Sequence, residues 1–247
     1  MVSFIGWWMQ VTALNWLTYR LTDSPLVLGL VNFVALLPVG LVTLFGGILA
    51  DRMPSRRLML LTQIAALLLC AILVALTANG WIRVWHIMLL TLGLGSANTI
   101  EASARFAVVR DSIVDRQDLA NAVSLGVSLS NIARAIGPAL AGFVIAWVSE
   151  AGSFLLNMLS YLAVILALFT MHLPTTAGEQ ERNVQVGHDL LDGVTYAWHN
   201  QAIRGLLSLL IASGLLVQPF TLLLPVFARD VLLMGPGGYG LLMGAFG

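Results

Sequence analysis

Long apolar runs, separated by short charged or polar stretches, account for almost the whole chain. A helix that crosses the hydrocarbon core of a bilayer, which is about 30 Å thick, needs roughly 20 mostly apolar residues. The pattern therefore predicts an all-α membrane protein in which charged residues mark the connections between spans. The predicted spans are 1–19, 24–50, 58–82, 84–109, 119–149, 151–178 and 205–228, and a further span begins at 231 and runs to 247.

The connection at 173–200 differs from the others in length and pattern. Residues 175–187 are polar and predict a solvated loop. Residues 188–200 have apolar side chains at helical spacing, which is typical of a short helix at the membrane interface; an unstructured loop is the alternative. The predicted organisation is a six-helix bundle at 1–172, a linker with an interfacial helix at 173–200, and the first helices of a second bundle at 201–247.

Composition argues against a water-exposed protein. Hydrophobic residues make up 59% of the chain and charged residues 10%, whereas soluble domains carry about a quarter charged residues. The net charge of zero leaves no basic stripe for nucleic acid. All twelve basic residues are arginines, so the lysine of an ATP-binding phosphate loop is absent, and the four histidines lack metal-ligand spacing. We therefore expect no enzyme activity, cofactor, metal, ATP or nucleic-acid partner.

The arginines also predict an orientation, because cytoplasmic loops of membrane proteins are enriched in basic residues. Three arginines, Arg20, Arg83 and Arg229, fall on one side of the predicted spans, and Arg134 lies within a span. This bias predicts a multi-pass protein of the bacterial inner membrane with a cytoplasmic N-terminus. The eight arginines on the predicted cytoplasmic side are Arg52, Arg56, Arg57, Arg105, Arg110, Arg116, Arg182 and Arg204.

The connection after the second predicted span reads GILADRMPSRR at 47–57. An acid followed by three arginines at a helix end can pair with neighbouring helix ends. The segment resembles the signature loop of the major facilitator superfamily, G-x-L-a-D-R-x-G-R-[KR], with Pro54 and Ser55 as departures. The resemblance implies that it helps to stabilise the outward-open arrangement of the two halves; an ordinary arginine-rich cytoplasmic loop is the alternative. The motif residues are Gly47, Asp51, Arg52 and Arg56.

The fifth predicted span carries small residues every four positions, at Ala133, Gly137 and Ala141. Such a stripe lets another helix pack closely, and Pro138 removes one backbone hydrogen bond and permits a kink. The segment resembles the fifth-helix motif of major facilitator antiporters, g-x-x-x-G-P-x-x-G-G, with two glycines replaced by alanine. The resemblance favours export over uptake, and a structural kink is the alternative. We take the candidate residues of this motif to be Arg134, Gly137, Pro138 and Gly142.

Stretches along 3–168 resemble one branch of this superfamily, the enterobactin-exporter-like efflux proteins, and the match resumes at 224–226 and 238–242. The resemblance implies twelve helices in two bundles built from three-helix repeats, of which the chain would hold about two-thirds. We therefore expect a fragment of such a transporter. Many antiporters of the superfamily place an arginine in the middle of the fourth helix for proton coupling, whereas 89–95 has no basic residue here.

Charged residues inside spans are costly and are candidates for function. Glu101 and Arg105 are four residues apart and are predicted to pair along one helix, because Arg134 lies roughly 12 Å deeper by helical rise. For Glu101, proton carriage competes with a structural role. Arg134 is predicted either to be a cavity residue that binds an anionic group or a helix-end carbonyl, or to be a structural arginine neutralised by an acid of the other half. Amides in spans are packing contacts or cavity residues, and the cavity candidates are Gln10, Asn32, Asn98 and Asn131.

Together these features predict a secondary-active transporter of the major facilitator type. The predicted activity is export of a small amphipathic molecule, such as a siderophore, drug or metabolite, by proton antiport and alternating access. The expected partners are the lipid bilayer, the small-molecule substrate and the proton. A lysophospholipid-type flippase and a non-transporting helical membrane module are the alternatives.

Overall fold

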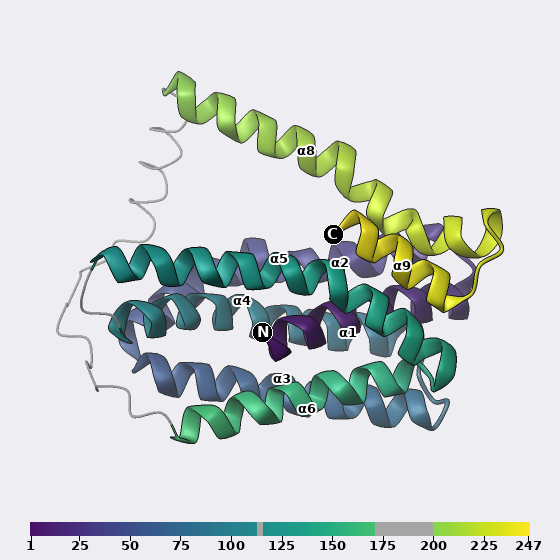
Figure 1. Cartoon of the computed structure of the whole chain (residues 1–247), viewed down its shortest axis with the longest axis horizontal. Coiled ribbons are helices and arrows are strands. Elements are labelled where there is room, and N and C mark those ends of the chain that lie inside the picture. The colour runs from purple at the N-terminus through teal and green to yellow at the C-terminus, as the bar shows by residue number, and fades with distance from the viewer. Residues whose placement is uncertain (113–115, 171–199) are drawn as a thin grey trace.

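The computed structural model describes residues 1–112, 116–170 and 200–247, apart from some side chains within 44–52, 107–120 and 202–219. Every regular element in these ranges is helical, so the all-α prediction is confirmed (Figure 1). The loop and the interfacial helix predicted at 175–200 lie outside the described residues, except for residue 200. The elements are α1 (Val2–Thr22), α2 (Pro25–Arg52), α3 (Ser55–Ala78), α4 (Val84–Ser112), α5 (Arg116–Trp147), α6 (Glu150–Thr170), α8 (Gln201–Val226), η1 (Phe227–Val231) and α9 (Pro236–Phe246).

Local signals explain most helix boundaries. Asp23 adopts a left-handed conformation that ends α1, and the Ser24 hydroxyl accepts a hydrogen bond from the Val27 amide at the start of α2. The third helix ends at Ala78, four residues earlier than predicted, because the chain turns at Gly80 with φ 71°. The last predicted span was placed too early: the chain leaves α8 through the π-helical turn η1, and α9 begins only at Pro236.

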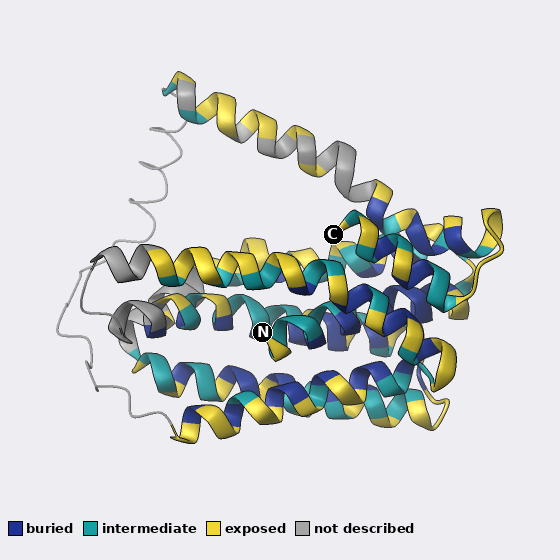
Figure 2. Ribbon diagram, viewed as in Figure 1, coloured by how far each residue is buried: buried dark blue, intermediate teal, exposed yellow. Residues whose placement is uncertain are grey.

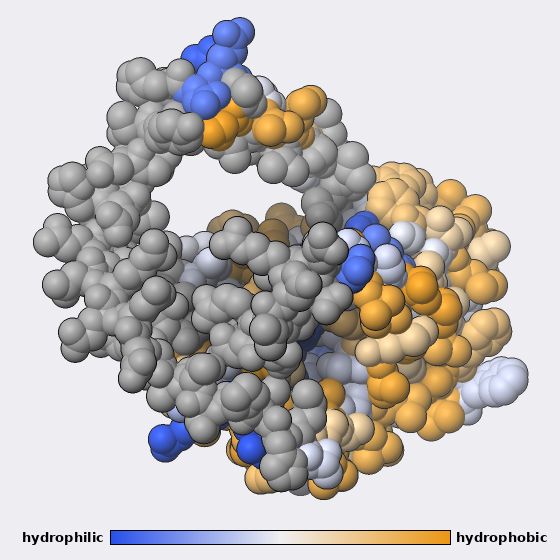
Figure 3. All heavy atoms as spheres, turned by 60° about the vertical axis from the view of Figure 1, so that its left-hand side comes forward, coloured by the Kyte–Doolittle hydropathy of each residue, from blue (hydrophilic) through white to orange (hydrophobic). Residues whose placement is uncertain are grey.

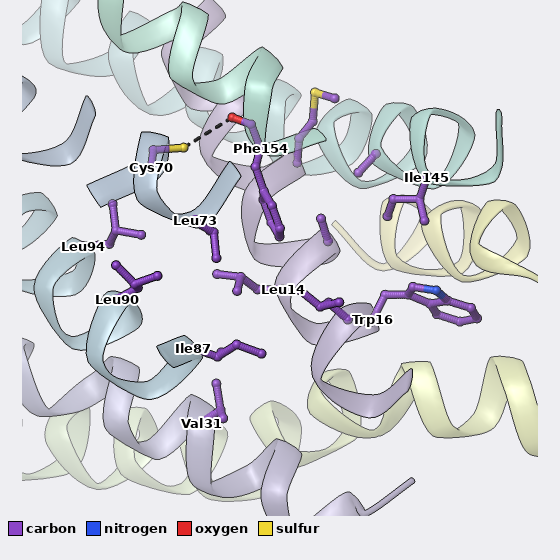
Figure 4. Packing of buried hydrophobic residues seen from close by; sticks show 14 of the residues in the cluster. Leu14, Trp16, Val31, Cys70, Leu73, Ile87, Leu90, Leu94, Ile145 and Phe154 are labelled. Atoms are coloured by element: carbon purple, nitrogen blue, oxygen red, sulfur yellow. Dashed lines mark hydrogen bonds between the residues drawn. The ribbon is translucent and has the colours of Figure 1, made fainter. Parts of the chain in front are cut away.

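α1 lies at the centre of the bundle formed by α1 to α6. Its residues are buried without interruption from Thr12 to Tyr19, while α3 packs against both α4 and α6. Figure 4 shows the core around it, where Leu14 of α1, Leu73 of α3 and Ile87 of α4 come together. This burial holds the polar residues Gln10, Asn15 and Thr18 of α1 inside the bundle.

The outside of the bundle is apolar. Exposed leucines and isoleucines follow the outer faces of the helices, as on α3 at Leu61, Leu68 and Ile72, and Figure 2 shows exposed residues along the outer faces. Hydrophobic residues also cover much of the described flank in Figure 3. Apolar patches of this extent are not left in water, so the surface fits a lipid environment.

Among the described residues, four helices are long and apolar enough to cross a membrane by composition: Pro25–Thr43, Ser55–Ala78, Asn121–Trp147 and Glu150–Thr170. The sequence pattern predicted more spans than these. α1 is less apolar than these four helices because it carries buried polar residues such as Gln10, Asn15 and Thr18. α4 is less apolar because it carries Glu101 and Arg105. Polar residues of this kind are tolerated where they face the bundle interior.

The C-terminal helices meet the six-helix bundle mainly at one end. α9 packs along α5, and α8 diverges from α5 toward the other end (Figure 1). Described side chains in the first turns of α8, including Leu206 and Leu209, are exposed. The two parts of the chain are therefore in contact at the end where α1, η1 and α9 meet.

The single cysteine gives a direct test of this packing. Cys70 has no solvent exposure, and its Sγ lies 3.3 Å from both Gln10 Oε1 and the Phe154 carbonyl oxygen. We expect Cys70 in the folded protein to resist a maleimide and to react fully after denaturation. Mass spectrometry of the labelled protein measures this, and rapid labelling in native conditions would contradict the described core.

Candidate functional site

α5 lies between α1 and α9, and glycines allow the close contact on both sides. Toward α1, a Cβ atom at Gly137 would lie 2.6 Å from Trp8 Cβ and 3.1 Å from the Ile5 carbonyl oxygen. Such distances leave no space for a side chain, so only glycine fits at this crossing. One face of the fifth-helix motif therefore holds α5 against the N-terminal half of α1.

The other face of α5 contacts the backbone of α9. A Cβ atom at Gly142 would lie 2.9 Å from Gly240 Cα, and one at Gly240 would lie 2.5 Å from the Pro138 carbonyl oxygen. Further along, a Cβ atom at Gly244 would lie 2.6 Å from the Ala135 carbonyl oxygen. This contact uses residues of α5 outside the predicted stripe of Ala133, Gly137 and Ala141, and its glycines on α9 were not identified from the sequence as a packing surface.

Arg134 lies at the junction of α1, α5 and α9. Its guanidinium carbon is 5.4 Å from the centre of the Trp8 ring, and its backbone carbonyl oxygen would be 2.5 Å from a Cβ atom at Gly247. A guanidinium that rests on an aromatic face keeps its in-plane N–H donors available for an anion. Among the described residues, no carboxylate pairs with Arg134.

The predicted ion pair between Glu101 and Arg105 is present, and Arg105 Nη2 donates to Glu101 Oε1. Glu101 is 5% exposed. The Arg105 guanidinium lies 4.5 Å from the centre of the Phe4 ring. Phe4 and Trp8 are four residues apart and therefore lie on one face of α1. Two arginines and one acid thus flank this face, which gives it a net positive charge.

The predicted cavity amides have different surroundings. Gln10 is buried, and its Oε1 accepts a 2.7 Å hydrogen bond from Asn157 Nδ2, which joins α1 to α6. Asn32 donates to Asn15 at 2.9 Å and joins α2 to α1. Asn131 is exposed and Asn98 is partly buried. Gln10 and Asn32 are therefore contacts between helices, as polar residues in membrane bundles commonly are.

The 47–57 segment forms the last turns of α2 and the start of α3. Arg56 Nε donates to the Leu168 carbonyl oxygen at 3.0 Å, and its Nη2 donates to the Phe169 carbonyl oxygen at 3.2 Å. Arg56 therefore satisfies carbonyl groups that the C-terminus of α6 leaves without intrahelical donors. The surroundings of Gly47 and the side chains of Asp51 and Arg52 lie outside what the structure describes.

The opposite end of the bundle holds charged contacts that the sequence pattern treated only as helix boundaries. Arg20 of α1 forms a two-point contact with Glu150 of α6, whose shorter distance is 2.7 Å. Asp23 pairs with Arg229 of η1 at 2.6 Å, the Tyr19 hydroxyl donates to Asp230 Oδ2, and Arg229 lies over the Tyr19 ring at 5.5 Å. We call Tyr19, Asp23, Arg229 and Asp230 the α1–η1 contact.

Comparison with known proteins identifies the family. A sequence profile of the transmembrane secretion effector family matches residues 1–247. The chain is also 30% identical over 174 residues to the staphyloferrin A transporter of Staphylococcus aureus (strain NCTC 8325 / PS 47), a match over 70% of this chain and 44% of the relative. The chain thus spans less than half of that relative. The present chain is part of a multi-pass membrane protein and belongs to the transmembrane secretion effector family of the major facilitator superfamily.

Proposed function

We propose that the protein exports a small amphipathic molecule from the bacterial cytoplasm by proton antiport and alternating access. The observation that carries this proposal is the contact of α5 with α1 on one face and α9 on the other, through glycines that leave no space for side chains. Two helical units that touch along such smooth backbone surfaces can change their mutual angle without unpacking large side chains. The 30% identical relative, a staphyloferrin A transporter, supports a siderophore as the first substrate to test.

The charges at the two ends support an orientation with the 51–57 connection in the cytoplasm. Of the three arginines at the other end, Arg20 and Arg229 are each paired with a carboxylate. The orientation itself follows from the count of arginines, eight on the side of the 51–57 connection against three on the other. In this orientation the bundle at 1–172 and the helices at 201–247 touch at the outer end, which corresponds to an inward-facing arrangement.

Substrate recognition in this proposal centres on Arg134. The guanidinium is partly buried at the meeting point of α1, α5 and α9, and its stacking on Trp8 leaves donor groups for a carboxylate or another planar anion. An amphipathic anion would satisfy both the charge and the neighbouring aromatic surface. Asn131, one turn away on the same helix, is exposed and is a further candidate for polar contact with the substrate.

Proton coupling in this proposal centres on Glu101. Protonation of its carboxyl group would remove the charge that holds Arg105, and Arg105 would then present a free guanidinium on the face of α1 that carries Phe4. For antiport, protonation of Glu101 and anion binding at Arg134 must alternate in the cycle, so that Arg105 is released from Glu101 only while no substrate is bound. This role would replace the fourth-helix arginine that the sequence lacks.

Inverted membrane vesicles carrying the full-length protein test export and coupling together. An acidic vesicle interior is expected to drive accumulation of labelled staphyloferrin A or of another small amphipathic anion. A protonophore is expected to stop that accumulation. Accumulation that survives collapse of the proton gradient would overturn the antiport mechanism, and no accumulation of any tested compound would overturn export.

The substitution Arg134→Ala is expected to weaken binding of the transported anion by about 10- to 100-fold, because a hydrogen bond to a charged group contributes roughly 1.5–3 kcal/mol. Equilibrium binding of the labelled compound to the purified protein measures the change. Arg83→Ala is the matched control, since Arg83 is an exposed arginine in the connection before α4. Equal affinities of the two variants would show that Arg134 does not contribute to binding of the anion.

A further inference from the structure

The α1–η1 contact joins parts of the chain that lie about 200 residues apart in sequence. Asp23 and Tyr19 belong to the C-terminal end of α1, whereas Arg229 and Asp230 belong to the π-helical turn after α8. Because α1 is the central helix of the first bundle and η1 belongs to the second group of helices, these contacts hold the two parts together at one end. Tyr19 and Asp23 lie within the stretches along 3–168 that resemble the efflux proteins, but the sequence assigned no role to any of these four residues.

We propose that the α1–η1 contact is the outer gate of the transport cycle, and that its separation opens the protein to the outer side. The proposal rests on the proposed transport function and adds the residues that control one of its steps. The Asp23–Arg229 pair and the Tyr19–Asp230 hydrogen bond separate together, since Arg229 also lies over the Tyr19 ring. The contact between Arg20 and Glu150 at the same end remains in place.

Exposure distinguishes the contacts that separate from those that persist. The Asp23 side chain is 70% exposed and that of Arg229 is 37% exposed. Water can solvate both groups once they part, so this ion pair is weak and reversible. In the other pair the Arg20 side chain is 51% exposed, but the carboxylate partner, Glu150, is only 10% exposed and receives two hydrogen bonds from Arg20. Arg20 therefore stays bound to α6, and the end of α1 moves with the first bundle.

The backbone of η1 fits a role in gating. The Leu232 amide donates to the Phe227 carbonyl oxygen and the Met234 amide to the Ala228 carbonyl oxygen, so the turn is wider than an α-helical one. Leu233 follows in a left-handed conformation with φ 53°, which is unfavourable for a leucine. π-Helical turns are frequent at functional sites, and this one places two consecutive polar residues against α1.

An aromatic contact forms a second layer of the same closure. Trp16 of α1 stacks on Tyr239 of α9, with ring centres 5.7 Å apart and an angle of 21° between the planes. Both rings are buried, and Ala228 of η1 has no exposure. Opening of the gate must part these rings as well, and it would expose Ala228 to water from the outer side.

Thiol labelling tests the gate without any substrate. Ala228→Cys introduces a buried thiol next to Arg229, and Cys70 provides no competing exposed thiol. In cells that express the full-length protein, a membrane-impermeant maleimide is expected to label this cysteine about three- to tenfold faster when Asp23→Asn and Asp230→Asn are added, because two contacts of the closed state are lost. Arg20→Gln is the control and is expected to leave the rate unchanged.

Cross-linking tests the same gate during transport. A short thiol cross-linker between Asp23→Cys and Arg229→Cys is expected to abolish vesicle accumulation while substrate binding from the cytoplasmic side persists. The same reagent between Arg20→Cys and Glu150→Cys joins two helices of one bundle and is expected to leave transport intact. Unchanged labelling of Ala228→Cys, or normal transport by the cross-linked gate pair, would overturn the proposal. If no compound is transported at all, the labelling result alone still decides whether the gate opens.

Discussion

Gly240→Ala is expected to destabilise the folded protein by about 1–3 kcal/mol, because an added methyl group must be accommodated in fully packed structure. The new Cβ atom would lie 2.5 Å from the Pro138 carbonyl oxygen and 2.7 Å from Gly142 Cα. These neighbours are backbone atoms, which cannot rotate away as a flexible side chain could. Denaturant unfolding of the purified protein in mixed micelles measures the free energy, and export by the variant is expected to fall in parallel.

Gly29→Ala is the matched control for this prediction. A Cβ atom at Gly29 would meet nothing within 4 Å, and alanine is favoured over glycine inside a helix by up to about 1 kcal/mol. We therefore expect Gly29→Ala to leave the free energy of unfolding unchanged or to raise it. Equal effects of the two substitutions would show that α5 and α9 do not touch as described.

Asn157→Leu is expected to lower the free energy of unfolding by about 1–3 kcal/mol, because it removes two interior hydrogen bonds that contribute about 0.5–1.5 kcal/mol each. Asn157 has no solvent exposure, its Nδ2 donates to Gln10 Oε1, and its Oδ1 accepts from Ser160. The α1 backbone is also close: a Cβ atom at Gly6 would touch Asn157 Oδ1. The branched leucine side chain would therefore replace two hydrogen bonds and press against α1.

Asn131→Leu provides the comparison for the same chemical change at an exposed position of α5. Exposed substitutions away from packed features usually change stability by no more than about 0.5 kcal/mol. Thermal unfolding of both variants in one detergent, followed by circular dichroism, compares them directly. A stability loss at Asn131 equal to that at Asn157 would contradict the interior network between α1 and α6.

Helices and their approximate bounds follow from the sequence because apolar length and charged breaks are local properties. The same holds for the Glu101–Arg105 pair, whose members are one turn apart on one helix. The α1–η1 contact could not be predicted, since Tyr19 and Asp230 are 211 positions apart and nothing local relates them. Arg20 and Arg229 were interpreted only as charges that mark the ends of spans and the orientation, although each has a specific partner.

The glycine contacts show a similar division. Gly137 and Gly142 were identified by a motif of small residues on one helix. Such a motif predicts close packing but does not predict which helix packs against it. The partner glycine, Gly240, was placed within the predicted span 231–247 and in the 238–242 stretch that resembles the efflux proteins, with no contact assigned to it. Only the three-dimensional structure shows that α5 contacts α1 through one face of the motif and α9 through the other.

The polar character of α1 has a consequence for how the protein is made. A helix leaves the translocation channel for lipid when its own side chains favour hydrocarbon, and Gln10, Asn15 and Thr18 of α1 do not. Their partners or covering surfaces belong to helices synthesised later, including α6, which supplies Asn157 to Gln10. Stable integration of the first helix therefore depends on helices that follow it, and biogenesis of the bundle is cooperative rather than sequential.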